Sequence, residues 1–224
     1  MLTASIKSED LPEIFPVFPL AGALLLPHGR LPLNIFEPRY LAMVEDALGQ
    51  GRYLGMVQPD KRLADGPSGP GLYKIGCLGR ISGFEETQDQ RYLITLTGVS
   101  RFIINEEIAP QRFYRRVRAD FLNFSDDLVP DKTETLPFPK QDFLELLGQY
   151  FATVEAEINW EAINKMADKD LLTSLCMVCP FTAEEKQALL EAASMSLRAE
   201  CLRTLMKIYS FKNGSSTHNT TRLN

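Results

Sequence analysis

The chain has 224 residues, of which 45% are hydrophobic and 24% charged, a balance typical of a globular protein with a sizeable core. Its formal net charge of −5 argues against a dedicated nucleic-acid binder or a basic membrane-surface protein. The charge is uneven: residues 1–122 hold 14 basic and 14 acidic side chains, whereas residues 123–224 hold 10 and 15. This difference suggests two structural units.

The most apolar stretch near the start lacks the features of a targeting segment. It runs from Ile14 to Pro27, contains prolines, and follows acidic rather than basic residues, whereas a secretory signal begins with positive charge and has an unbroken apolar centre. A membrane helix needs about 20 apolar residues, and the sequence has no such run. We therefore expect a cytoplasmic protein with no membrane association. Its cysteines should be reduced thiols: Cys77, Cys176, Cys179 and Cys201.

The first half of the sequence has the pattern of a β unit. Short apolar runs alternate with glycine, proline or charged turn residues. Several such strands in succession favour a closed or nearly closed antiparallel barrel, which removes exposed strand edges. The predicted strands are residues 15–18, 31–36, 53–57, 72–84, 91–96, 101–104 and 114–121.

Two segments interrupt these strands. The first is a helix, in which Glu37 is the N-cap, Pro38 takes the first helical position, and Gly49 and Gly51 mark the end. The second is residues 59–71, where repeated glycine and proline predict a loop.

The second half changes to helical periodicity after a predicted linker at residues 123–139. Four helices follow, and Thr182 with Glu185 has the pattern of a capping box for the third. Residues 213–224 are polar and predict a disordered tail. The predicted apolar stripes are Phe143, Leu146, Leu147, Tyr150 and Val154; Leu171, Leu172, Leu175 and Val178; Leu189 and Leu190; and Leu197, Cys201, Leu205 and Ile208.

Short motifs in this chain resemble, in order, the N-terminal domain of Lon proteases. FPL at residues 18–20 and LPLNIFEPRY at residues 31–40 resemble the run that opens that domain, and PFTAEEKQALLE at residues 180–191 resembles part of its helical region. Between them, three segments resemble successive strands of the domain: residues 53–57, 75–81 and 96–102. The likeness covers residues 14–211, and five pieces in the right order are more specific than any one of them.

The resemblance implies an α+β fold: an N-terminal PUA-like antiparallel β pseudobarrel with one inserted helix, followed by a C-terminal α-helical bundle. The expected divisions are residues 1–122 for the barrel, 123–139 for the linker, 140–212 for the bundle and 213–224 for the tail. In Lon proteases this domain helps to recognise and hold substrate proteins, while separate domains hydrolyse ATP and cleave peptides. We therefore expect a free-standing, non-enzymatic module that binds proteins or peptide segments, without cofactor or metal.

Two motifs point to chemistry but have simpler explanations. The run from Asp65 to Gly69 resembles the surroundings of the nucleophilic serine of the Lon peptidase, whose hydroxyl needs a lysine base beside it. Here Ser68 is followed by glycine and proline, as in a surface turn, so a hydrolase is disfavoured. Cys176 and Cys179 form a lone C-x-x-C, whereas structural zinc needs four ligands; small buried side chains are the favoured interpretation.

An arginine-rich strand provides the alternative function, because PUA-like barrels elsewhere bind RNA. Strand alternation places Arg116 and Arg118 on one face and Arg115 on the other, so the basic set is divided. A solvated outer face is therefore favoured over a nucleic-acid site. The four arginines are Arg112, Arg115, Arg116 and Arg118.

Two surfaces are candidates for partner binding. The apolar connection at residues 20–27 is either packed across the barrel end, the favoured interpretation, or an exposed patch. The second candidate is a groove between barrel and helices. Candidate contacts on the two surfaces are Leu24, Leu25 and Leu26, and Phe36, Tyr40, Tyr150 and Trp160. We further expect Glu37 and Arg101 to form a structural ion pair that fixes the first helix against the barrel.

Overall fold

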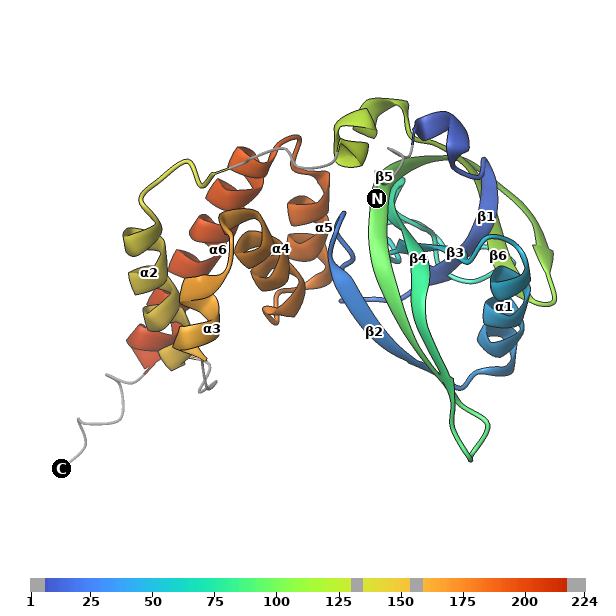
Figure 1. The fold of residues 1–224 in the computed structure, drawn as a ribbon, viewed down its shortest axis with the longest axis horizontal. Coiled ribbons are helices and arrows are strands. Elements are labelled where there is room, and N and C mark those ends of the chain that lie inside the picture. Colours follow the sequence, from blue (N-terminus) through green and yellow to red (C-terminus); the bar gives the residue numbers. More distant parts are fainter. Residues whose placement is uncertain (1–6, 130–134, 154–158, 217–224) are drawn as a thin grey trace, which may run out of the picture. The chain divides into compact units, whose positions relative to one another are not determined.

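A computed structural model gives the structure of residues 7–129, 135–153 and 159–216. The chain divides into two compact units, whose elements are labelled in Figure 1. The barrel unit comprises residues 1–132 and 177–190, and the helical unit comprises residues 133–176 and 191–224.

The barrel unit is built on one mixed sheet. Its strands are β1 (Ile14–Pro19), β2 (Arg30–Ile35), β3 (Tyr53–Val57), β4 (Ile75–Glu86), β5 (Tyr92–Gln111) and β6 (Tyr114–Asp120). Its helices are η1 (Ser8–Asp10), α1 (Pro38–Gly49), η2 (Leu122–Leu128) and α5 (Ala183–Glu191), of which the last residue belongs to the helical unit. The predicted class, strands first and helices later, is confirmed.

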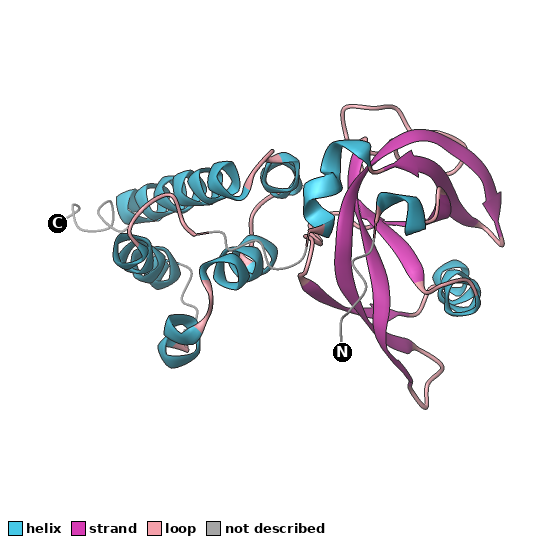
Figure 2. Cartoon of the chain, turned by 45° about the horizontal axis from the view of Figure 1, so that its top comes forward, coloured by secondary structure: helices cyan, strands magenta, loops and turns pink. Residues whose placement is uncertain are grey.

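The sheet closes into a barrel because β5 pairs with both of its ends. β4, β3, β1 and β6 pair side by side in that order, and β6 then pairs with β5, which also pairs with β4. β2 joins the first part of β5, at residues 92–97. Figure 2 shows the strands curving around one another, with α1 beside them. One pair departs from the antiparallel expectation: β1 and β3 are parallel, because the chain passes through β2 and α1 between them.

β5 is a single long strand, whereas the sequence predicted two strands separated near Gly98. That glycine does not turn the chain. A Cβ atom at this position would overlap the carbonyl oxygen of Leu26, because residues 26–29 cross β5 here. The His28 N–H donates to the Gly98 carbonyl at 2.9 Å, and the Gly98 N–H donates to the Gly29 carbonyl at 2.8 Å. Gly98 therefore marks a close backbone crossing within a continuous strand.

The interior of the barrel is apolar and aromatic. The rings of Phe15 and Phe102 meet edge to face with centroids 5.0 Å apart, and Phe121 lies 6.0 Å from Phe15. Val17, Leu78 and Val117, from three different strands, are completely buried around them. Burial of these side chains supplies the main driving force for closing the sheet.

Helix α5 lies between other helices in the sequence, yet it packs on the barrel through buried polar side chains. The Gln58 amide donates to the Ala183 carbonyl at 2.9 Å, and the Gln187 amide donates to the Ile75 carbonyl at 3.1 Å. The Lys186 ammonium donates to the Gly22 carbonyl at 2.8 Å. Buried polar groups are costly unless they are hydrogen-bonded, so these bonds determine where α5 docks.

The predicted capping box of α5 is confirmed. The Thr182 N–H donates to the Glu185 carboxylate at 2.9 Å, and the Glu185 N–H donates to the Thr182 hydroxyl at 3.2 Å. The two bonds satisfy N–H groups that have no partner inside the helix.

Arg101 is a buried charge of the barrel unit, and its carboxylate partner is Asp127. Two guanidinium nitrogens each lie 2.9 Å from the Asp127 carboxylate, and the Arg101 N–H donates to the same group at 3.0 Å. The guanidinium also lies 4.5 Å from the centre of the Phe124 ring. Both Asp127 and Phe124 belong to η2, in the stretch that was predicted to be a linker.

The predicted pair between Glu37 and Arg101 is therefore wrong. Glu37 is the N-cap of α1, but its side chain makes no capping bond and instead binds Arg39 at 2.8 Å, near the surface. Arg101 is buried and paired on a different element. Sequence spacing gave no indication of η2, which supplies the actual partner.

We predict that Asp127→Ala lowers the free energy of unfolding by about 3–5 kcal/mol, because it leaves a buried guanidinium without its counter-charge. Glu37→Ala removes only an exposed ion pair and should cost less than about 1 kcal/mol. Urea unfolding of the two variants measures both values, and equal losses would contradict the assignment of Asp127 as the structural partner.

The turn between β5 and β6 holds two bulky residues in an unfavourable backbone conformation. Arg112 and Phe113 have φ values of 44° and 70°, in a two-residue hairpin loop of the kind that usually contains Asn-Gly. Phe113 is 90% exposed. Arg112 is held by Glu45 and Asp46 of α1 at 2.8 and 2.9 Å, which stabilises the turn from outside.

We predict that Phe113→Gly raises the free energy of unfolding by about 1 kcal/mol. Glycine adopts the left-handed backbone conformation without the strain that a phenylalanine side chain causes there. Little packing is lost in exchange, because the phenylalanine ring is almost fully exposed. In a chain of this size the melting temperature should rise by about 2–4 °C. Scanning calorimetry measures the shift. Phe36→Gly is the control, since Phe36 is exposed but has no positive φ; a similar rise in that variant would show that strain is not the cause.

The helical unit consists of α2 (Lys140–Thr153), α3 (Trp160–Lys165), most of α4 (Asp168–Val178) and α6 (Met195–Ser216). α3 was not predicted. Its start is capped by Asn159, whose side chain accepts the Ala162 N–H at 3.0 Å. α2 and α6 pack against each other, and the rings of Tyr150 and Tyr209 lie 6.3 Å apart.

The first two predicted stripes are largely correct. In α2, Phe143, Leu146, Leu147 and Tyr150 are buried, and Val154 lies outside the described residues. In α4, Leu171, Leu172 and Leu175 are buried, whereas Val178 at the helix end is exposed.

The predicted stripe of the last helix is only partly correct. Leu205 is buried and Cys201 is half-buried, whereas Leu197 and Ile208 are exposed. The buried face of α6 also includes Ala199, Leu202 and Met206, so it is rotated from the predicted one. The α6 backbone also continues to Ser216, past the predicted start of the tail. The rest of the tail, residues 217–224, lies outside the described residues.

Candidate binding site

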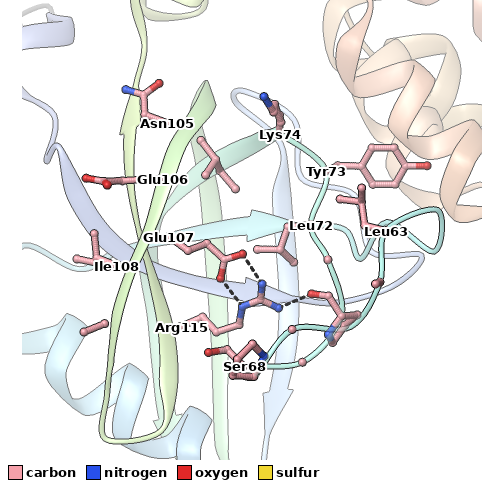
Figure 3. A pocket seen from close by; sticks show the side chains of 18 residues that line it. Leu63, Ser68, Leu72, Tyr73, Lys74, Asn105, Glu106, Glu107, Ile108 and Arg115 are labelled. Atoms are coloured by element: carbon pink, nitrogen blue, oxygen red, sulfur yellow. Dashed lines mark hydrogen bonds and ion pairs between the residues drawn. The ribbon is translucent and has the colours of Figure 1, made fainter.

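The barrel unit has a cavity of about 630 Å³ on one side of β5. One wall is the loop at residues 63–74, apart from Asp65, and the other is residues 104–109 of β5, with Arg115 of β6 between them. Figure 3 shows the loop and the strand facing each other across this space. We call it the β5 groove. Its size is that of a typical ligand site.

Arg115 connects the two walls of the groove. Its guanidinium binds both carboxylate oxygens of Glu107, at 2.9 and 2.6 Å, and donates to the Pro70 carbonyl at 2.7 Å. Figure 3 marks these contacts with dashed lines. The arginine side chain is only 9% exposed, and a bidentate pair of this kind is geometrically specific. Arg115 thus sets the distance between the loop and β5.

Ser68 lies on the loop wall of the groove and is exposed. Within the described residues its hydroxyl has no hydrogen bond to a lysine or any other base. The backbone around it forms a small turn in which Gly66 and Gly69 bond to each other, and no helix begins there. The serine therefore lacks the activation that a nucleophile requires.

Most of the predicted partner-binding residues are buried. Leu24, Leu25 and Leu26 are at most 2% exposed, because residues 20–29 pack across the barrel where Gly98 makes room for them. The packed interpretation of this segment is therefore correct, and an exposed patch is excluded. Tyr40 and Tyr150 are buried as well, within their respective units.

Phe36 and Trp160 are exposed, so the prediction that they contact a partner remains a prediction. Phe36 lies directly before α1 in the barrel unit. Trp160 begins α3 in the helical unit and lines a shallow depression with Gly148.

The arginine-rich strand carries little free charge. Arg112 binds Glu45 and Asp46, and Arg115 binds Glu107. Arg118 binds Glu13 at 2.7 Å and Glu106 at 2.9 Å. Of the four, only Arg116 has no acidic partner in the part of the chain that the structure describes; it donates to Gln111 at 2.8 Å. Three of the four arginines are therefore paired with carboxylates, which neutralise most of the positive charge of this segment.

Tyr114 begins this strand and is linked to α1. Its hydroxyl donates to the Asp46 carboxylate at 2.8 Å. Burial, reinforced by the hydrogen bond to Asp46, raises the pKa of Tyr114 to about 12. The unfolded chain would ionise this phenol near its ordinary pKa of about 10.

We predict that Tyr114 contributes stability that is complete below pH 10 and is lost as the pH rises from 10 to about 12, because the folded state keeps its proton longer than the unfolded state. Urea unfolding at a series of pH values measures this loss, and Tyr114→Phe should reduce its slope. Asp46→Asn should lower the Tyr114 pKa in a phenolate absorbance titration. An unchanged slope in Tyr114→Phe would contradict the assignment.

Neither metal-binding clusters nor membrane-spanning helices are found in the described ranges. No three histidine, cysteine or acidic side chains there are grouped to hold a metal ion. None of the helices assigned there combines the length and the apolar character needed to cross a bilayer. Cys176 and Cys179 are both buried thiols outside any disulfide, in agreement with the interpretation as small core side chains.

Comparison with protein families identifies the barrel and the helices as one known domain. The model of the ATP-dependent protease La (LON) substrate-binding domain matches residues 14–207. The chain belongs to this family. The resemblance that was found in the sequence motifs is thus confirmed, and it extends through both units.

Individual relatives agree with this assignment. Lon protease 2 of Myxococcus xanthus is 24% identical over 212 residues, covering 90% of this chain and 24% of the relative. The Lon protease of Anaeromyxobacter dehalogenans is 24% identical over 207 residues, with the same coverage. The chain therefore spans about a quarter of the length of these relatives.

Solved structures show the same fold. The Lon N-terminal domain protein from Xanthomonas campestris has a TM-score of 0.58 at 22% identity, covering 85% of this chain and 97% of that one. The N-terminal domain of Mycobacterium avium complex Lon protease has a TM-score of 0.57 at 18% identity, covering 88% and 98%.

The β5 groove of this Lon-type domain has no binding-site signature in the sequence. Its two walls are separated by at least thirty positions in the chain, and only the barrel brings them together. The available signal was the glycine- and proline-rich loop at residues 59–71, which was recognised as a loop but not as part of a site.

Proposed function

We propose that this chain is a non-catalytic module that recognises protein substrates or partners in cytoplasmic proteolysis or quality control. The observation that carries the proposal is the match to a substrate-binding domain over residues 14–207. The β5 groove supports it, because it is large enough for a peptide segment and has no activated nucleophile at Ser68. The neutralised arginines of β6 support protein rather than RNA as the partner.

The exposed apolar side chains of the barrel unit favour the same function. Leu63 in the groove, Phe36 and Phe113 all present most of their surface to solvent. Exposed apolar side chains near a groove commonly contact a partner. Since these residues lie on different elements, we expect partner contacts to extend beyond the groove itself.

We predict that the protein binds unfolded polypeptide at least about tenfold more tightly than native polypeptide, because only unfolded chains offer apolar segments to such a surface. Fluorescence anisotropy measures this with fluorescein-labelled α-lactalbumin, either reduced and carboxymethylated or native. Neither ATP nor a casein substrate should be hydrolysed in the same preparation.

A labelled single-stranded RNA is the matched control. Its retention should be no greater than that of the native protein. The proposal is wrong if the unfolded protein is not bound, or if the RNA binds with an affinity that falls steeply as salt is raised.

A further inference from the structure

The wall of the β5 groove is the edge of a strand rather than its face. Successive side chains of a strand point to opposite sides, so a strand that lines a cavity with its face contributes every second residue. All six consecutive residues of β5 from Ile104 to Ala109 line this groove. The cavity therefore runs along the backbone of β5.

This part of β5 has a neighbouring strand on one side only. Up to Ile103, β5 pairs with β4. Beyond that residue it pairs with β6, from Ile103 to Gln111, and among the described residues no strand lies on its other side. The Ile104 N–H still donates to the Lys74 carbonyl, at 2.8 Å, and Pro110 has no N–H to offer. Residues 105–109 thus form a short open edge.

The edge remains open because the chain before β4 turns away from it. Tyr73 donates its N–H to the Gln58 carbonyl at 3.0 Å, and Pro59 bridges to Leu72, so the loop is tied to the end of β3. Arg115 then holds the loop across the groove from Glu107 through the Pro70 carbonyl. The gap is maintained by an ion pair between a buried arginine and a more exposed glutamate.

Apolar side chains on both walls of the open edge suit an apolar occupant. Within the described residues, the charged side chain that also lines the groove but has no acidic partner is Lys74. Leu63 and Ile108 offer apolar contacts on opposite walls. The carboxylates of Glu106 and Glu107 are already paired with Arg118 and Arg115. An incoming segment would therefore meet backbone polar groups along one side and apolar side chains around it.

We propose that an extended apolar segment of an unfolded polypeptide binds in the β5 groove by adding as a strand to the edge at residues 105–109, a mode that rests on the proposed protein-binding function. An open strand edge presents N–H and C=O groups that another extended backbone can satisfy, and flanking side chains select the sequence. A second copy of this chain is disfavoured, because a symmetric antiparallel pairing centred on residues 105–109 would place Glu107 opposite the Glu107 of the other copy, and like charges opposite each other destabilise a sheet.

Hydrogen exchange of the full chain tests where the unfolded protein binds. With saturating carboxymethylated α-lactalbumin, those amides of residues 105–109 that point away from β6 should exchange about tenfold more slowly, since strand addition protects the N–H groups of the open edge. Residues 92–97, which already have strands on both sides, are the internal control and should not change. Protection elsewhere without protection at the edge would overturn strand addition and leave the proposed function standing; absence of any binding would overturn both.

A pair of leucine variants tests the groove. Leu63 lines it and is 52% exposed, whereas Leu122 lies outside it and is 76% exposed, so both variants should fold. Leu63→Asp should weaken binding of the unfolded protein about tenfold, because it places a charge among the apolar contacts. Leu122→Asp should leave the affinity unchanged. Equal effects of the two substitutions would overturn the assignment of the groove.

A backbone-modified peptide separates strand addition from side-chain binding. The probe is a fluorescein-labelled octapeptide of alternating valine and threonine, N-methylated at every second residue in either of two registers. Strand addition uses one edge of the peptide, so one register should lose about tenfold in affinity and the other should retain it. Equal loss in both registers, no loss in either, or failure of the unmodified peptide to bind would overturn the proposal. Concentration-dependent dimerisation through the same amides without any probe would assign the edge to a second copy instead.

Discussion

Closure of the barrel depends on one strand that is longer than all its neighbours. β5 runs from Tyr92 to Gln111 and pairs with β2, β4 and β6 in turn. A sheet closes when the strands at its two ends pair, and here β5 is long enough to pair with β4 along one part and with β6 along another. The same length leaves residues 105–109 without a strand on one side, because β4 begins opposite Ile103. The closed barrel and its one open stretch of edge therefore have a common origin.

The positions of η2 and α5 on the barrel depend on buried polar contacts rather than on apolar burial alone. Arg101 reaches Asp127 of η2 and also donates to the Leu190 carbonyl of α5 at 3.3 Å. Gln58 and Gln187 complete the docking of α5. Apolar packing is tolerant of small shifts, whereas a buried charge or amide is satisfied only in one geometry. These contacts therefore give the barrel unit its specific arrangement.

Internal charge pairing also determines what the surface of this Lon-type domain can recognise. The sequence suggested a basic strand, but its arginines are almost all bound to carboxylates of α1, β5 or the segment before β1. Their charge is used to hold the hairpin and the groove in place. Backbone at the strand edge and apolar side chains such as Leu63 and Phe113 remain exposed beside these pairs, and under the proposed function they are the groups that a polypeptide would contact.

Local patterns in the residues were sufficient to predict that strands precede helices, and to predict the helix after Pro38, the capping box at Thr182 and the family, because each of these depends on spacing or on motifs within a few residues. The folded arrangement was needed to show that β5 is continuous through Gly98, that Arg101 pairs with Asp127, that α5 belongs with the barrel, and that loop residues 63–74 face the β5 edge. Each of these four features depends on segments that are far apart in the chain. A backbone crossing or a buried counter-charge produces no periodic pattern in the neighbouring residues from which it could be predicted.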